Sequence, residues 1–235
     1  MNDEGGRRLA LTAAVLAASA VSASAQSPPV LVAILPFEDR GSFGQDKQRY
    51  EALQLGIPAT IAAELSSHPE IRLVNPTRVT QALRSQRIAA TARLDAATAA
   101  RVGKEVGARY AVTGNFADFY GRFQLDARVV DVETAQILKV VSNSDPALQD
   151  RTDLYRILQR VGHKVLAEVD PSAAREIREA KSRVIPTEAL LQFSLGLLRE
   201  SQGNTGEAAQ HYDQALSTFP DYPEARAGLR RVRGS

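Results

Sequence analysis

The feature that most constrains this sequence is a continuous apolar run, Val30–Leu35 (VLVAIL), which Pro36 closes. A run without polar alternation is typical of a strand that is buried on both faces. Such a strand needs helices packed on its sheet, so the rest of the chain has to supply them.

Helical patterns follow the run. From Tyr50 onward, apolar residues recur at the spacing of one helix face, at Leu53, Ile57, Ile61 and Leu65. Pro58 lies inside this pattern and either kinks the helix or marks its first turn. Asn75-Pro76 predicts the start of a second helix, and Asp95 predicts the start of a third, alanine-rich helix that ends at Gly107.

The remaining strands are predicted at Ile71–Val74 and Tyr110–Phe116, and as an alternating, half-buried strand over 123–129. A turn at Asp131–Thr134 leads to a hairpin partner, Gln136–Val141, and Asp153–Val169 is a further helix. The order β α β α α β β β α predicts an α/β (α+β) fold, a mixed β-sheet with helices packed on it.

The amino-terminal residues 1–25 have the pattern of a cleaved signal peptide. Leu9–Val21 is an uncharged run that follows Arg7 and Arg8, and Ala23 and Ala25 occupy the positions that a signal peptidase accepts. The run is shorter than the roughly 20 apolar residues that a membrane-spanning helix needs. We expect export to the periplasm, by the Sec or the twin-arginine route, with cleavage after Ala25 and residues 26–29 as a linker.

Composition excludes several classes of protein. The chain has no cysteine, so no disulfide and no lipidated cysteine is expected. The net charge is +2, and we find no basic face interleaved with aromatic residues, which argues against a nucleic-acid partner. No later stretch is long and apolar enough to predict an integral membrane span.

The carboxyl-terminal part has the spacing of one 34-residue tetratricopeptide repeat, Ala189–Tyr222. The matching positions are Leu195-Gly196, Ala208, Tyr212, Ala215 and Pro220, with Gly203 at the turn between two helices. Gln192 and Arg199 replace the aromatic residues that the pattern usually has. A single repeat cannot bury its own apolar face, so we expect a capping helix at Pro223–Val232 and a neighbour on its other side.

The predicted organisation is therefore a signal peptide (1–25), a linker (26–29), an α/β domain (30–170), a connecting helix (171–188) and the repeat with its capping helix (189–235). If the repeat binds a partner, its inner helix offers Gln192, Phe193, Leu195 and Arg199 as contact residues. The alternative is a plain helical hairpin that only covers the α/β domain.

Several segments resemble a known superfamily of periplasmic α/β domains. Gly56–Val74 resembles the amino-terminal domain of the TolB periplasmic protein and the related domain of CsgG, the curli assembly and transport component. Val32–Phe37 is similar to the first strand of the superfamily, Ala100–Gly114 to its helix–strand signature, and Leu125–Thr134 to its hairpin. Together they span most of residues 30–142.

The resemblance implies a protein-binding accessory role in the periplasm or at the outer membrane. The chain departs from the superfamily because it has no lipidated cysteine, no inserted hairpins long enough for a transmembrane barrel and no β-propeller. Ala135 also stands where the hairpin turn often has glycine.

No catalytic pattern accompanies these segments. His68, His163 and His211 lie far apart and have no ligand-spaced neighbour, and no Gly-x-Ser-x-Gly elbow occurs. Gly103-Lys104 lacks the serine or threonine of a phosphate-binding loop, so its glycine is expected to serve close packing. We expect no enzyme activity, no cofactor and no metal.

Two hypotheses follow. The first is a non-enzymatic envelope protein that binds envelope or secretion proteins, as a monomer or oligomer, with peripheral outer-membrane association left open. Truncation after Val184 should then leave a folded domain that has lost its partner.

The alternative is a small-ligand sensor or an unrecognised enzyme that uses the loop after Phe37 and residues near Asn75, where open α/β sheets bind ligands. It requires a well-formed apolar pocket there.

Overall fold

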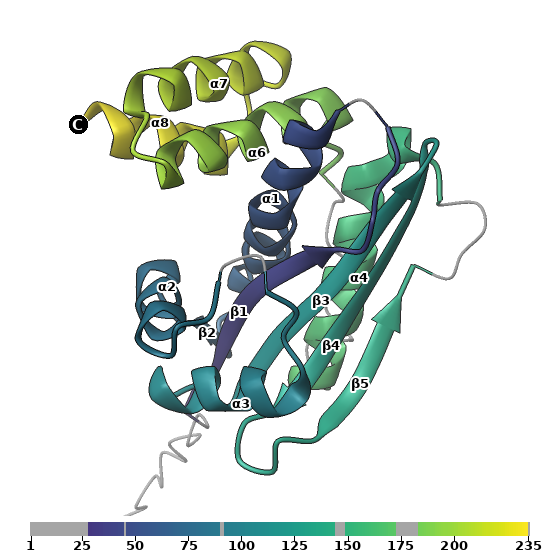
Figure 1. The fold of residues 1–235 in the computed structure, drawn as a ribbon, viewed down its shortest axis with the longest axis vertical. Helices are drawn as coiled ribbons and strands as arrows, with labels where there is room; N and C mark the ends of the chain where they lie inside the picture. The colour runs from purple at the N-terminus through teal and green to yellow at the C-terminus, as the bar shows by residue number, and fades with distance from the viewer. Residues whose placement is uncertain (1–27, 45, 90–91, 144–148, 173–182, 235) are drawn as a thin grey trace, which may run out of the picture.

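The computed structural model describes residues 28–44, 46–89, 92–143, 149–172 and 183–234 (Figure 1). The predicted signal peptide, the first half of the linker and most of the predicted connecting helix lie outside the described residues.

The centre of the molecule is one five-stranded sheet in the order β2-β1-β3-β4-β5. Its strands are β1 (Val30–Asp39), β2 (Ile71–Leu73), β3 (Tyr110–Phe119), β4 (Arg122–Asp131) and β5 (Ile137–Ser142). β1 pairs in parallel with β2 and β3, whereas β3, β4 and β5 form an antiparallel meander. The sheet is mixed, as the order of elements predicted.

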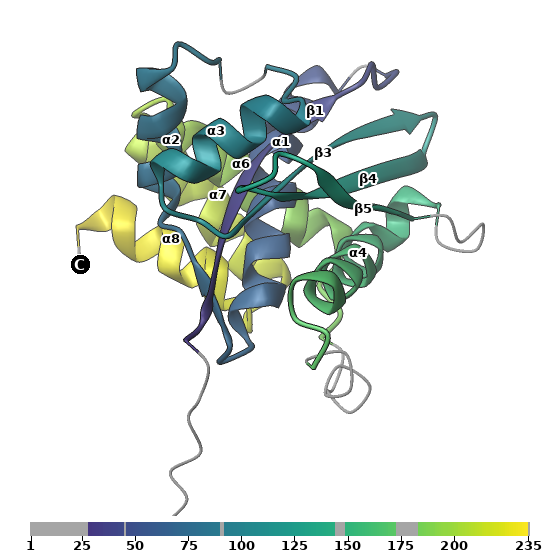
Figure 2. The ribbon, with the colours of Figure 1, turned by 90° about the horizontal axis from the view of Figure 1, so that it is seen from below.

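Helices cover both faces of the sheet (Figure 2). Helices α1 (Lys47–Ser66) and α4 (Leu154–Val169) cover one face, and a short 3-10 turn, η2 (Arg151–Asp153), precedes α4. The main core lies under them and includes Val32, Phe37, Ile57, Phe116 and Leu125, all fully buried. Helices α2 (Pro76–Ser85) and α3 (Ala96–Glu105) pack on the other face over a second core that includes Ala33, Leu35 and Ala111.

The predicted helix starts are confirmed by their caps. The Asn75 side chain accepts a hydrogen bond from the backbone N–H of Thr77 at 2.8 Å, and Asp95 accepts one from Thr98 at 2.8 Å. A Cβ at Gly103 would lie 2.5 Å from Val132, so this glycine serves close packing of α3 on the sheet.

Several details differ from the sequence-based expectation. Residues 183–186 of the predicted connecting helix are not helical, and the next helix begins at Thr187. β1 runs on to Asp39, and its register with β3 shifts between Ile34 and Phe37, where Pro36 has no N–H to donate. Pro58 lies inside α1 and does not mark its first turn.

The carboxyl-terminal helices form the predicted hairpin with a third helix after it. They are α6 (Thr187–Ser201), α7 (Thr205–Thr218) and α8 (Pro223–Arg233), and Gly203 turns the chain between α6 and α7 with φ +82°. α6 packs on α1, so the α/β domain is the neighbour that the hairpin needs (Figure 1). Among the described residues, the helices are too short or too polar to cross a bilayer.

Candidate protein-binding surfaces

The hairpin is assembled around one aromatic side chain, Tyr212 of α7. A Cβ at Gly196 of α6 or at Gly228 of α8 would lie 2.5 Å from the Tyr212 ring, so only glycine fits at these crossings. The Tyr212 hydroxyl donates a hydrogen bond to Glu200, and Arg231 of α8 pairs with the same carboxylate at 2.9 Å. Gly196 and Tyr212, which both occupy positions of the tetratricopeptide-like pattern, thus pack directly against each other.

The four residues predicted to contact a partner fall into two groups. Phe193 and Leu195 are buried: Phe193 packs on the rings of Tyr212 and Tyr222, and Leu195 packs near Ala52 of α1. Gln192 and Arg199 are partly exposed. Gln192 is hydrogen-bonded to His211 at 2.8 Å, and Arg199 forms an ion pair with Glu207 at 2.8 Å. A partner that binds this helix would therefore contact Gln192 and Arg199, because only these two of the four side chains are accessible.

A second surface comes from the sheet itself. α2 and α3 cover only one end of the sheet face on which they pack. In Figure 1, no helix lies in front of the upper parts of β3, β4 and β5 on that face. We call this area the open sheet face. The register aligns two rows of side chains on this side of the sheet. Glu38, Asn115, Asp126 and Ser142, all partly exposed, form one row, and buried Thr113, partly exposed Arg128 and exposed Val140 form the next.

Arg128 is the central side chain of the open sheet face. It is partly buried, and its Nε has no hydrogen-bond partner among the described residues. Burial and the nearby Arg93 guanidinium lower the pKa of Arg128 below its ordinary value. Beside it, the side chain of Val140 is 52% exposed. Arginine is among the residues that protein interfaces favour.

Three aromatic residues lie at one corner of the sheet, and we call them the aromatic tip: Phe43 in the loop after β1, and Phe119 and Tyr120 at the turn between β3 and β4. They are 59%, 40% and 88% exposed, and the Phe43 ring stacks on the other two at 6.2 and 6.4 Å. The sequence-based reasoning missed this cluster. The predicted strands ended at Phe116 and began again at 123, so Phe119 and Tyr120 fell in the connection between them and gave no sign of the cluster.

Buried polar groups fix the aromatic tip. Asp118 is fully buried, and its carboxylate accepts hydrogen bonds from the backbone N–H of Gly121 at 2.7 Å and from Arg151 at 2.9 Å. The Tyr50 hydroxyl donates to the carbonyl of Phe43 at 3.2 Å. Burial and the Asp118 carboxylate raise the pKa of Tyr50, so the phenol keeps the proton that it donates.

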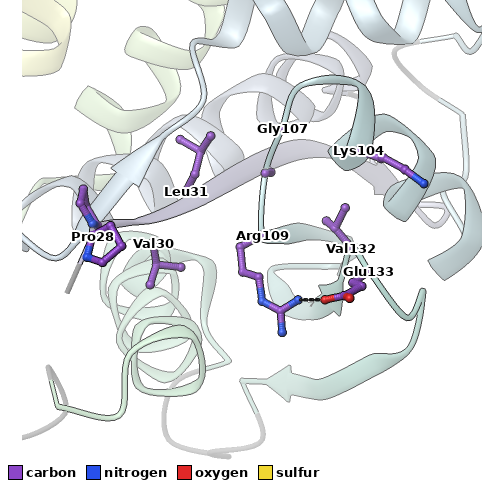
Figure 3. A pocket seen from close by; sticks show the side chains of 10 residues that line it. Pro28, Val30, Leu31, Lys104, Gly107, Arg109, Val132 and Glu133 are labelled. Atoms are coloured by element: carbon purple, nitrogen blue, oxygen red, sulfur yellow. Dashed lines mark hydrogen bonds and ion pairs between the residues drawn. The ribbon is translucent and has the colours of Figure 1, made fainter.

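A hollow of about 630 Å³ lies at the amino ends of β1 and β3, lined by Pro28, Leu31, Lys104, Arg109 and Glu133 among others (Figure 3). Arg109 is engaged there by Asp131 and Glu133, each at 2.9 Å. The hollow lies at the opposite end of β1 from the loop after Phe37, and Asn75 is not among its lining residues, so it does not match the site that the ligand-binding hypothesis placed there.

The histidines take part in local contacts. His163 lies 3.4 Å from Glu64, and His211 bonds to Gln192. Within the described ranges, no three His, Cys, Asp or Glu side chains converge as metal ligands would.

Comparison with known proteins gives only distant likenesses. No family model matches the chain, and no curated protein matches it. Among solved structures, the LpoB carboxyl-terminal domain from Escherichia coli is 14% identical, with a TM-score of 0.39 over 52% of this chain and 86% of that one. The corresponding domain from Salmonella enterica is 14% identical, with a TM-score of 0.37 over 51% and 84%.

The hypothetical protein CT253 from Chlamydia trachomatis is 13% identical, with a TM-score of 0.36 over 61% of this chain and 99% of that one. At TM-scores below 0.5 these likenesses establish neither a shared family nor a shared function. None of the structures named here is a TolB, CsgG or tetratricopeptide protein, so those resemblances stay predictions.

Proposed function

We propose that this chain is an exported, non-enzymatic accessory protein of the cell envelope that binds other proteins. The export pattern of residues 1–25 and the resemblance to periplasmic α/β domains support the compartment. The partner is an envelope or secretion protein.

The open sheet face is the observation that carries the proposal. It presents a partly buried Arg128, exposed Val140 and the flanking carboxylates of Glu38 and Asp126 on rigid strands. Strand-borne side chains lose little conformational freedom on binding, which lowers the entropic cost of association. The guanidinium of Arg128 is partly exposed, so it can donate a charge-assisted hydrogen bond to a partner carboxylate.

The carboxyl-terminal hairpin offers a second binding surface at Gln192 and Arg199. Its inner helix is largely occupied by α1, because Ser194 sits against Gly56 and Leu195 packs near Ala52. The hairpin therefore packs against the α/β domain and stabilises it. Its proposed partner-binding role depends on the exposed side of α6 alone.

Site-specific photo-crosslinking tests the proposal. A photoreactive phenylalanine analogue is placed at Val140 on the open sheet face, at Gln192 on α6, and at exposed Ser66 at the end of α1 as the matched control. The protein is expressed with its export signal in a Gram-negative host. We expect an adduct with an envelope protein from position 140 and none from position 66.

The variant Arg128→Gln keeps most of the side-chain length but removes the guanidinium, so it should reduce the adduct from position 140. An adduct from position 192 alone would move the binding site to the hairpin. The absence of adducts from both positions in the exported protein would contradict the proposal.

A further inference from the structure

The aromatic tip places three large apolar rings in water at one corner of the molecule. Scattered exposed apolar residues are ordinary, but three stacked rings form a contiguous patch. Phe43 also bridges to Phe119 through the backbone, so the two loops act as one unit. The loops lie at the same end of the sheet in both ribbon views (Figures 1 and 2).

Tyr120 has a backbone conformation that a tyrosine rarely adopts. Its φ is +54° and that of Gly121 is +89°, which is the pattern of a two-residue type I′ hairpin turn. Asn-Gly or Gly-Gly is favoured in such a turn, and a bulky side chain in the left-handed region is strained. The chain thus keeps an aromatic ring where a small polar residue would suit the fold better, and strain of this kind tends to occur at functional positions.

The backbone polar groups of the tip are largely satisfied within the chain. The N–H of Phe43 donates to Asp118 and its carbonyl accepts from Tyr50, at 2.9 and 3.2 Å. The N–H of Gly121 donates to Asp118, and its carbonyl accepts from the N–H of Arg151 at 2.8 Å. A loop whose backbone is already hydrogen-bonded can enter a medium poor in water without the penalty of unpaired groups.

The charged side chains around the tip differ in how exposed they are. Two acidic side chains beside the tip are engaged within the loops: Asp39 accepts from Gly41 and Ser42, and Asp118 is buried. Asp46 and Asp150 are exposed nearby. The exposed flanking cations are Arg40 and Arg122, and Arg122 lies opposite Phe119 in the hairpin. Aromatic rings flanked by arginines are the combination that suits the boundary between lipid headgroups and acyl chains.

From these observations we propose that the aromatic tip is a peripheral membrane-contact site that inserts Phe43, Phe119 and Tyr120 into the headgroup boundary of a phospholipid bilayer. A protruding patch with a satisfied backbone fits a deformable lipid surface better than it fits a pocket of a protein. The aromatic tip shares no residue with the open sheet face. The membrane-contact proposal and the protein-binding proposal can therefore be tested and refuted separately. Three rings give weak, reversible binding, comparable to that of a single lipid chain.

The chain contains no tryptophan, which makes a direct test available. The variant Phe43→Trp places a single indole in the tip, and Ile137→Trp places one on β5, at a side chain that is 43% exposed and outside the tip. Both full-length variants are mixed with vesicles of phosphatidylethanolamine and phosphatidylglycerol. We expect the emission of the indole at position 43 to shift to the blue and that at position 137 to stay unchanged.

The variant Tyr120→Asn separates membrane contact from folding. Asparagine suits the left-handed turn position, so this variant should fold at least as well as the original chain. It should lower the partition coefficient on the same vesicles, in co-sedimentation, by about tenfold, the effect expected for the loss of one inserted ring. Adding Phe43→Ser should abolish co-sedimentation.

Two results would overturn the proposal. One is an unshifted emission at position 43 at saturating vesicle concentration. The other is co-sedimentation that Tyr120→Asn with Phe43→Ser leaves intact. If a photoreactive group at position 43 captures a protein while the vesicles have no effect, the tip is a protein-binding site instead.

Discussion

Gly56 of α1 lies at a close contact between the two parts of the molecule. A Cβ at this position would lie 1.9 Å from the Oγ of Ser194 on α6, well inside van der Waals contact. The Ser194 hydroxyl is itself engaged, since it donates to the carbonyl of Leu190 at 2.8 Å. The small residues on both helices thus set the distance between the hairpin and the α/β domain.

We expect Gly56→Ala to lower the free energy of unfolding by about 1–3 kcal/mol, the usual cost of overpacking a core. Ser194→Gly in the same chain should recover part of the loss, because it removes the clashing side chain. Urea denaturation of both single variants and the double variant measures this coupling.

Gly206→Ala is the matched control. Gly206 lies in α7 with no atom within 4 Å of its added Cβ, so alanine there should stabilise the helix by about 0.5–1 kcal/mol. Additive effects of Gly56→Ala and Ser194→Gly would contradict the contact.

Glu64 of α1 makes stability depend on pH. Burial by itself would raise the pKa of this carboxyl, but hydrogen bonds from His163 and Tyr155 outweigh burial and hold the pKa below its ordinary value. The Tyr155 hydroxyl donates at 2.8 Å, and the His163 ring lies 3.4 Å away. Because the folded pKa is lowered, this contribution is present above the unfolded pKa of about 4.3 and is lost as the pH falls through the folded value.

Glu64→Gln should therefore destabilise the protein at neutral pH, and the difference from the original chain should shrink as the solution is acidified below about pH 4. Urea unfolding at a series of pH values measures this difference. Glu51→Gln, at an exposed position of the same helix, is the control and should show no such trend. A difference that stays constant from neutral to acid pH for Glu64→Gln would refute the assignment.

At the scale of elements, α1 lies between the sheet and the hairpin and also contacts α4. One side packs on the sheet through Ile57 and Ile61, and the other side meets α6 at Ala52 and Gly56. The expectation that the α/β domain folds without the hairpin did not include the packing of α6 on α1. A helix that is buried on both sides loses part of its core when one partner is removed.

Truncation after Val184 should therefore yield a protein with a weakened core, contrary to the sequence-based expectation of an intact domain. We expect helical circular dichroism to persist in part, with a broad thermal transition and binding of a hydrophobic dye. A sharp transition and no dye binding in the truncated chain would restore the two-domain interpretation.

The elements themselves could be predicted because their signals are local. The four-residue spacing from Leu53 to Leu65 predicts α1, and the caps at Asn75 and Asp95 predict where α2 and α3 begin. The aromatic tip could not be predicted from such patterns, because Phe43 and Phe119 are 76 residues apart and meet only when β1 and β3 pair.

At the scale of the whole molecule, one core joins both parts of the chain. Phe37 and Val112 of the sheet, Ile61 of α1, and Phe193 and Tyr212 of the hairpin belong to the same cluster of buried residues. A continuous core of this kind favours cooperative unfolding, because neither part can lose its contacts without exposing the other.

We expect a single unfolding transition in which near-ultraviolet circular dichroism of the tyrosines and far-ultraviolet circular dichroism of the helices coincide. Scanning calorimetry should give one peak with equal calorimetric and van't Hoff enthalpies. Two separated transitions would show that the hairpin is an independent unit.

By itself, the sequence determined the mixed sheet, the starts of α2 and α3, and Gly196 at the crossing with Tyr212, because these depend on periodicity and spacing within short segments. Only the tertiary structure decided that α6 turns inward against Gly56, that Arg128 lies on an uncovered part of the sheet, and that Phe43 joins Phe119 and Tyr120. The physical reason is that each of these contacts joins distant segments. The exposure of a side chain depends on which segment packs against it, and a local pattern does not record that.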